Sequence, residues 1–89
     1  MKENQQDILE FPCDWPVKAF GPGTEAFELE VVSIVRRHAQ DLKENAVRTR
    51  PSKAGKYSAV TVTIRAQSRA QLEAIYTDLR AHPDVVMVL

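Results

Sequence analysis

The sequence predicts an α+β domain in which a four-stranded antiparallel sheet carries two helices on one face. Two observations support this prediction. The apolar residues change between a period of two and a helical period in the order strand, helix, strand, strand, helix, strand, and the two β-α-β halves are about equal in length. With right-handed crossovers, two such halves joined by a hairpin form the ferredoxin-like βαββαβ sandwich, whose strands follow the order 4-1-3-2. Residues 1–89 are expected to form a single domain.

The first half of the chain is predicted to contain a strand, a helix and a weaker second strand. Residues 14–20 alternate between two sets of side chains, and Pro16 places the start of this strand at an unpaired or edge position. Thr24 is an N-cap candidate, and the apolar stripe behind it predicts an amphipathic helix from residue 25 to about 39. The weaker strand covers residues 46–51 and forms one edge of the sheet.

The second half begins with a hairpin loop at residues 52–56, which contains the glycine that such connections favour. The strand at 57–65 is the clearest in the chain, because its apolar residues face one side and its polar residues the other. Ser68 and Gln71 form a capping box, in which Ser68 accepts from a helical amide and Gln71 reaches back. The helix that follows is expected to stop before Pro83.

The last strand, Val85–Leu89, is apolar at every position and forms the other edge of the predicted sheet. It lacks the Lys, Pro or bulge that usually blunts an edge strand, and only one of its faces can meet the helices. Residues 1–7 are expected to be disordered, and residues 8–13 to form an N-terminal arm, with Ile8, Leu9 and Phe11 as its apolar residues. Either this arm or another protein chain is expected to cover the edge, which predicts a homodimer or a protein partner there.

Six cations and no acid lie between Asn45 and Leu72, although the net charge of the whole chain is zero. The candidate surface for a partner or an anion consists of four hairpin cations and one further strand residue: Arg48, Arg50, Lys53, Lys56 and Arg65. Three interpretations stay open, namely a solvated surface, a contact with a partner protein, and a site for an anion or nucleic acid. The neutral net charge disfavours nucleic acid.

The sequence contains no motif for catalysis, for a cofactor or for a metal. Cys13 is the only cysteine, which excludes an internal disulfide and a Cys-x-x-Cys metal pair. His38 and His82 fall at the ends of the two helices, where we expect them to serve as caps. No apolar run is long enough to span a membrane, and Met1–Gln6 does not resemble a signal peptide, so we expect a cytoplasmic protein. Because no catalytic motif is present, we also expect that the protein is not an enzyme.

Four segments resemble the YbeD-like family of small bacterial proteins of unknown function, of which the hairpin segment is the most specific: Leu9–Pro12, Val31–His38, Pro51–Ile64 and Val86–Leu89. The resemblance covers nearly the whole chain. It implies a βαββαβ domain similar to the ACT regulatory domains of amino-acid metabolism. The family also carries a label that links it to lipoate regulation.

The likeness to ACT domains implies one ligand site, in the turn between the first strand and the first helix. Gly21, Gly23 and Thr24 occupy this turn, and the amides at a helix start can hold a carboxylate. Pro22 departs from such a site because it has no amide proton. The sequence thus predicts a regulatory or protein-interaction module of the ACT-like type, and the alternative is an anion or nucleic-acid binder that uses the basic hairpin from Arg48 to Lys56.

Overall fold

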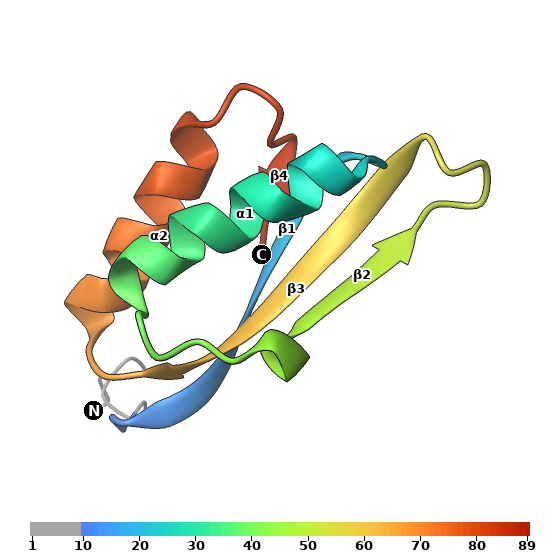
Figure 1. Ribbon diagram of the computed structural model, residues 1–89. Helices are drawn as coiled ribbons and strands as arrows, with labels where there is room; N and C mark the ends of the chain where they lie inside the picture. Colours follow the sequence, from blue (N-terminus) through green and yellow to red (C-terminus); the bar gives the residue numbers. More distant parts are fainter. Residues whose placement is uncertain (1–9) are drawn as a thin grey trace, which may run out of the picture.

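The computed structural model describes residues 10–89, which form a four-stranded antiparallel sheet with two helices on one face (Figure 1). In chain order the elements are β1 (Cys13–Pro22), α1 (Glu25–His38), the 3-10 turn η2 (Glu44–Ala46), β2 (Val47–Pro51), β3 (Tyr57–Ala66), α2 (Arg69–Ala81) and β4 (Met87–Val88). The strand order β2-β3-β1-β4 is the predicted order read from the other edge. The predicted fold class is therefore confirmed.

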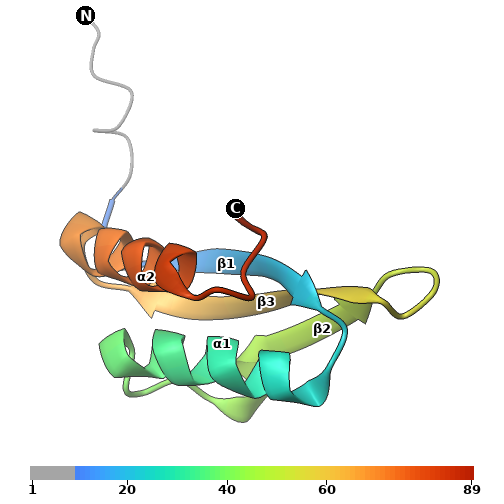
Figure 2. The same cartoon turned by 90° about the horizontal axis from the view of Figure 1, so that it is seen from above.

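The two longest strands, β1 and β3, lie at the centre of the sheet and pair over their full length, from Cys13 opposite Ala66 to Pro22 opposite Tyr57. Alternate side chains point to opposite faces. On the helix side Val17, Ala19 and Val62 are fully buried. The other side of the sheet has no helix over it, and the β2–β3 loop extends past the ends of the helices (Figure 2).

Helix α1 begins where the sequence predicts, because the Thr24 hydroxyl oxygen accepts a hydrogen bond from the Phe27 amide at 3.1 Å. One apolar stripe of this helix packs against the sheet; its buried members are Phe27, Val31, Ile34 and Val35. The helix ends at His38, and Ala39 is its C-cap. The boundary thus differs from the predicted one by a single residue.

Helix α2 is capped by Ser68, whose hydroxyl oxygen accepts from the Gln71 amide at 3.1 Å. The Gln71 side chain reaches back, but its oxygen accepts from the amide of Gln67 at 2.6 Å, one residue before the position that the capping box predicts. The same side chain donates from Nε2 to the His38 carbonyl oxygen at 2.7 Å. This second bond draws the amide group toward α1.

Strand β4 is shorter than predicted, since only Met87–Val88 have strand geometry. Its flanks still bond to β1: the Leu89 amide donates to the Lys18 carbonyl oxygen at 2.8 Å, and the Val86 amide donates to the Phe20 carbonyl oxygen at 2.7 Å. The sequence pattern located the strand but overestimated its length. Val85 does not pair with β1, because its amide donates to the His82 carbonyl oxygen at 3.1 Å in the turn after α2.

Pro16 lies in a central strand, yet its position is unpaired on one side as the sequence predicts. The bonds between β1 and β4 begin at Lys18, whose amide faces β4. Pro16 has the same orientation two residues earlier, beyond the end of β4. Its missing N–H therefore removes no hydrogen bond of the sheet.

Phe11 belongs to the predicted arm and is half-buried against the hydrophobic core. It precedes the start of β1, whereas β4 pairs with Ala19 and Phe20 near the other end of that strand. Phe11 therefore covers the core and leaves β4 uncovered. The arm residues Ile8 and Leu9 and the predicted disorder of residues 1–7 lie outside the described residues.

Candidate functional site

The open face of the sheet gathers cations from strands that are far apart in the sequence. Arg48 on β2 lies opposite Thr61 on β3, and Thr61 lies opposite Lys18 on β1. In the next row Arg50 lies opposite Ala59, which lies opposite Phe20. Lys18, Arg48 and Arg50 therefore share one surface, which we name the cationic face.

Two shallow depressions adjoin on this surface. One has a volume of about 370 Å³ and is lined by the cationic face together with Thr49, Ala59 and Thr61. The other measures about 220 Å³ and has an apolar lining that includes Phe20, Tyr57 and Pro51. Arg50 and Ala59 line both. The surface can thus contact a charged group and an apolar group side by side.

The three side chains of the cationic face form no ion pair with any carboxylate between residues 10 and 89. Arg65 differs, because it pairs with the Asp14 carboxylate at 3.2 Å. Four residues along β3 separate it from Thr61, which is roughly 13 Å in a strand. The positive charge of Arg65 is therefore balanced locally, away from Arg48 and Arg50.

The hairpin cations that the sequence groups together occupy two environments. Arg48 and Arg50 stand on the sheet, whereas Lys53 and Lys56 are exposed in the loop, where the Lys56 ammonium lies 5.9 Å from the centre of the Tyr57 ring. Lys18 is the residue that sequence reasoning missed. Its place in an alternating strand opposite Thr61 is a signal that only the strand register reveals.

The turn at residues 21–24, which corresponds to the ligand site of ACT domains, is filled by contacts within the protein. A side chain at Gly21 would collide with the Phe27 ring, and one at Gly23 would collide with the Gly55 carbonyl oxygen. The Gly23 amide donates to the Lys56 carbonyl oxygen at 3.0 Å, and the Thr24 hydroxyl caps α1. All three predicted residues thus have a packing or capping role in this structure.

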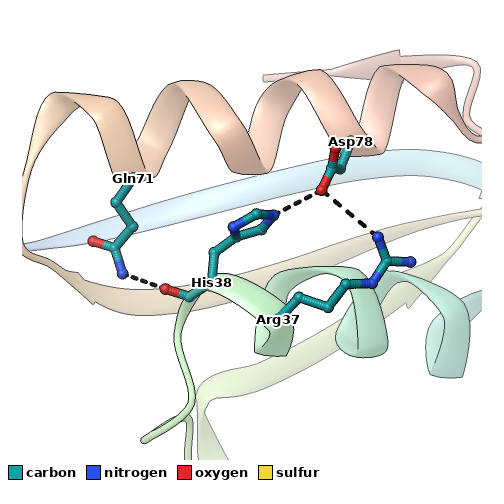
Figure 3. A network of polar contacts seen from close by, with 4 residues as sticks. All are labelled: Arg37, His38, Gln71 and Asp78. Atoms are coloured by element: carbon teal, nitrogen blue, oxygen red, sulfur yellow. Dashed lines mark hydrogen bonds and ion pairs between the residues drawn. The ribbon is translucent and has the colours of Figure 1, made fainter.

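A polar network joins the C-terminal end of α1 to α2 (Figure 3). The Asp78 carboxylate lies 2.7 Å from His38 Nε2 and 3.6 Å from Arg37 Nη1. Likewise, His82 lies 3.1 Å from the Glu30 carboxylate of α1. The rings of both histidines therefore link the helices, beyond the capping role that the sequence predicts. Their partners are 40 and 52 residues away along the chain, which no local pattern reveals.

The edge at β4 presents apolar side chains to the outside. Val86, Met87 and Leu89 are 72%, 48% and 61% exposed. Met87 lies opposite Phe20 and so faces the open side of the sheet, whereas Val88 lies opposite Ala19 and packs against the core. This edge is the second candidate surface of the molecule.

Within residues 10–89, no three His, Cys, Asp or Glu side chains come together as ligands for a metal ion. Cys13 is a half-buried free thiol. Neither of the described helices is both long and apolar enough to cross a membrane.

Comparison with solved structures places the fold among known ones. The solution structure of protein HP0495 from H. pylori aligns with a TM-score of 0.72 over 91% of this chain and 85% of that one, at 16% sequence identity. At this identity the likeness concerns the fold alone. It agrees with the arrangement of strands and helices described above.

Curated relatives match over the full chain. UPF0250 proteins from Paraburkholderia phytofirmans and Chromobacterium violaceum are 42% and 44% identical over 89 residues, which is 100% of this chain and of each relative. A UPF0250 protein from Neisseria gonorrhoeae is 39% identical and covers 99% of this chain and 97% of its own length. The family model described as "Protein of unknown function (DUF493)" matches residues 6–89. The resemblance to the YbeD-like proteins is thereby confirmed, and the chain belongs to this family of proteins of unknown function.

Proposed function

We propose that the chain is a protein-binding module that pairs with a second copy through β4. The observation that carries this proposal is the exposure of three apolar side chains in the edge strand β4 and directly beside it, Val86, Met87 and Leu89. An edge strand with unpaired backbone groups is a template for another strand, and charged residues usually protect it. Here no charged side chain lies between residues 85 and 89.

The backbone of β4 supports strand pairing at its outer side. Leu89 exchanges two hydrogen bonds with Lys18, so its amide and carbonyl face β1. Because the direction alternates between neighbouring residues of an antiparallel ladder, the amide and carbonyl of Val88 face away from the sheet, whereas the Val86 amide still bonds to β1. Two copies meeting at this position would form an isologous interface, in which each β4 pairs with the other. The sheet would then continue across both molecules.

We include in this proposal a regulatory role of the ACT-like type. We also include the link to lipoate regulation that the family label suggests. The proposal assigns no enzymatic step and no cofactor to the chain. An anion or nucleic-acid binder is the second candidate function. The observation that favours it is the position of Lys18 beside Arg48 and Arg50.

The test is to place a charge on the edge. Met87→Lys should weaken self-association by about tenfold or more, because lysine on an edge strand opposes strand pairing and the two copies would bring their like charges together on the continued sheet. Leu29→Lys is the matched control, since Leu29 is likewise apolar and exposed, at 61%, but lies on α1 rather than on a strand of the sheet. Sedimentation velocity over a range of protein concentrations measures the dissociation constant.

The expected result is a dimer whose dissociation constant rises with Met87→Lys and not with Leu29→Lys. A wild-type chain that stays monomeric at concentrations up to about 1 mM would contradict the proposal, since its affinity would then be negligible. Equal weakening by both substitutions would also contradict it.

A further inference from the structure

The opposite edge of the sheet, at β2, offers a different surface. The Ser52 amide donates to the Tyr57 carbonyl oxygen at 2.8 Å, which makes these two residues a bonded pair next to the end of β2. Bonded pairs recur every second residue along an antiparallel ladder, so Arg50 and Arg48 also direct their backbone groups toward β3. The backbone groups of Thr49 therefore face outward, away from the sheet.

Charged and uncharged side chains alternate along β2. Arg48 and Arg50 stand on the open face, about 7 Å apart along the strand. Between them, Thr49 points to the helix side, where its hydroxyl donates to the Glu28 carboxylate. A strand added beside β2 would place its side chains with the same alternation, every second one beside the two arginines and the others near Glu28.

We propose that the β2 edge binds an extended acidic segment of a partner protein by strand addition. The segment carries an acid at every second position, next to Arg48 and Arg50, and residues without negative charge in between, on the side of Glu28. Lys18 lies in the same row as Arg48 and Thr61, further in on β1, and adds positive charge to the depression of about 370 Å³ that the two arginines line. Backbone hydrogen bonds supply affinity in this mode, and the alternating side chains supply specificity.

A polypeptide fits this edge better than a nucleic acid does. The outward amide and carbonyl of β2 complement another peptide backbone, whereas a nucleic acid would use only the cations. The cationic face is also small, and the net charge of the chain is zero. Nucleic-acid binders more often carry a strongly basic domain. The charges and the backbone of this edge therefore favour a protein partner.

The inference goes beyond the pairing of β4, because it concerns the other edge of the sheet and can hold whether or not the chain forms a dimer. Met87→Lys should accordingly leave binding at β2 unchanged. Failure of one proposal can thus be told apart from failure of the other.

The experiment uses two labelled peptides of about ten residues with the same composition, one of alternating Glu and Thr and one with a Glu block followed by a Thr block. Fluorescence anisotropy at about 50 and about 200 mM salt measures their affinities, together with that of a single-stranded oligothymidylate of similar charge. We expect the alternating peptide to bind about tenfold more tightly than the block peptide, because only it matches the period of β2.

Two variants locate the site. Arg48→Gln combined with Arg50→Gln should weaken binding of the alternating peptide about tenfold, whereas Arg36→Gln combined with Arg80→Gln, on the helices, should not. Thr49→Pro removes the outward amide and should abolish the preference for alternation. Circular dichroism checks that each variant is folded.

Three results would overturn the proposal. Equal affinity for the two peptides would show that charge alone attracts them. Tighter binding of the oligothymidylate would indicate a nucleic-acid surface. Unchanged binding in a folded double variant of Arg48 and Arg50 would place the site elsewhere.

Discussion

The side-chain amide of Gln71 connects the ends of both helices. Its oxygen accepts from the Gln67 amide before α2. Its nitrogen donates to the His38 carbonyl oxygen at the end of α1, as Figure 3 shows. Helix ends leave backbone groups without partners inside the helix. One residue therefore satisfies a donor at one helix start and an acceptor at another helix end.

Replacing this residue should destabilise the fold. We expect Gln71→Ala to lower the free energy of unfolding by about 1–2 kcal/mol, because two backbone groups lose a partner. Gln40→Ala is the matched control, since Gln40 is exposed between α1 and β2. Urea denaturation followed by circular dichroism measures both. A loss no larger than that of the control would show that water replaces the amide at no cost.

At the scale of elements, the short strand β4 is held by more than its pairing with β1. The Trp15 indole donates from Nε1 to the Tyr76 hydroxyl at 2.9 Å, and that hydroxyl donates to the Leu89 carbonyl oxygen at 3.0 Å. The three residues come from β1, α2 and the end of β4. This chain of hydrogen bonds fastens the last residues to both layers of the domain.

Tyr76→Phe should therefore loosen β4. It leaves the Trp15 N–H and the Leu89 carbonyl without the hydroxyl, so we expect the free energy of unfolding to fall by about 1–2 kcal/mol. Amide hydrogen exchange at Lys18 and Leu89, which bond across β1 and β4, should become faster. Tyr57→Phe serves as control because Tyr57 is 52% exposed. If exchange at Lys18 is the same in both variants, the hydroxyl does not hold the strand.

The elements were largely predictable from periodicity and caps. Thr24 and Ser68 cap the two helices as the sequence indicates, and the alternation in β3 matches its burial residue by residue. The length of β4 was not predictable, because the Val85 amide bonds back to His82 in the turn after α2, which the apolar pattern does not indicate. The sequence pattern indicates which residues are apolar, whereas the length of a strand depends on its backbone hydrogen bonds.

At the scale of the whole molecule, the open face and the helix layer differ in how their charges are arranged. The cationic face gathers three cations on the open side, whereas the helices carry both signs, with acids such as Glu25, Glu28 and Glu73 and arginines such as Arg36 and Arg80. The candidate site was only partly predictable, because the strand register decides which cations share a surface. Sequence proximity grouped Arg65 and Lys53 with Arg48, while the strand register replaces them with Lys18.

Asp14→Asn tests whether the cationic face is as local as the register indicates. The Asp14–Arg65 pair is exposed, so its loss should change the free energy of unfolding by at most about 1 kcal/mol. Binding of the alternating acidic peptide should stay unchanged at about 150 mM salt, because the pair lies beyond the Debye length of about 8 Å. Lys18→Gln should weaken binding under the same conditions. Stronger binding by Asp14→Asn would mean that the surface extends to Arg65.

The central position of β1 and β3 has a consequence for the integrity of the chain. Each half contributes one of these strands, and the pairing between them runs from Cys13 to Pro22 and from Tyr57 to Ala66. The core is thus the contact between the halves, so neither half encloses a core alone. A protease cut in the exposed loop at residues 52–56 would leave two fragments that need each other to fold, and the cut protein would remain assembled as a non-covalent pair.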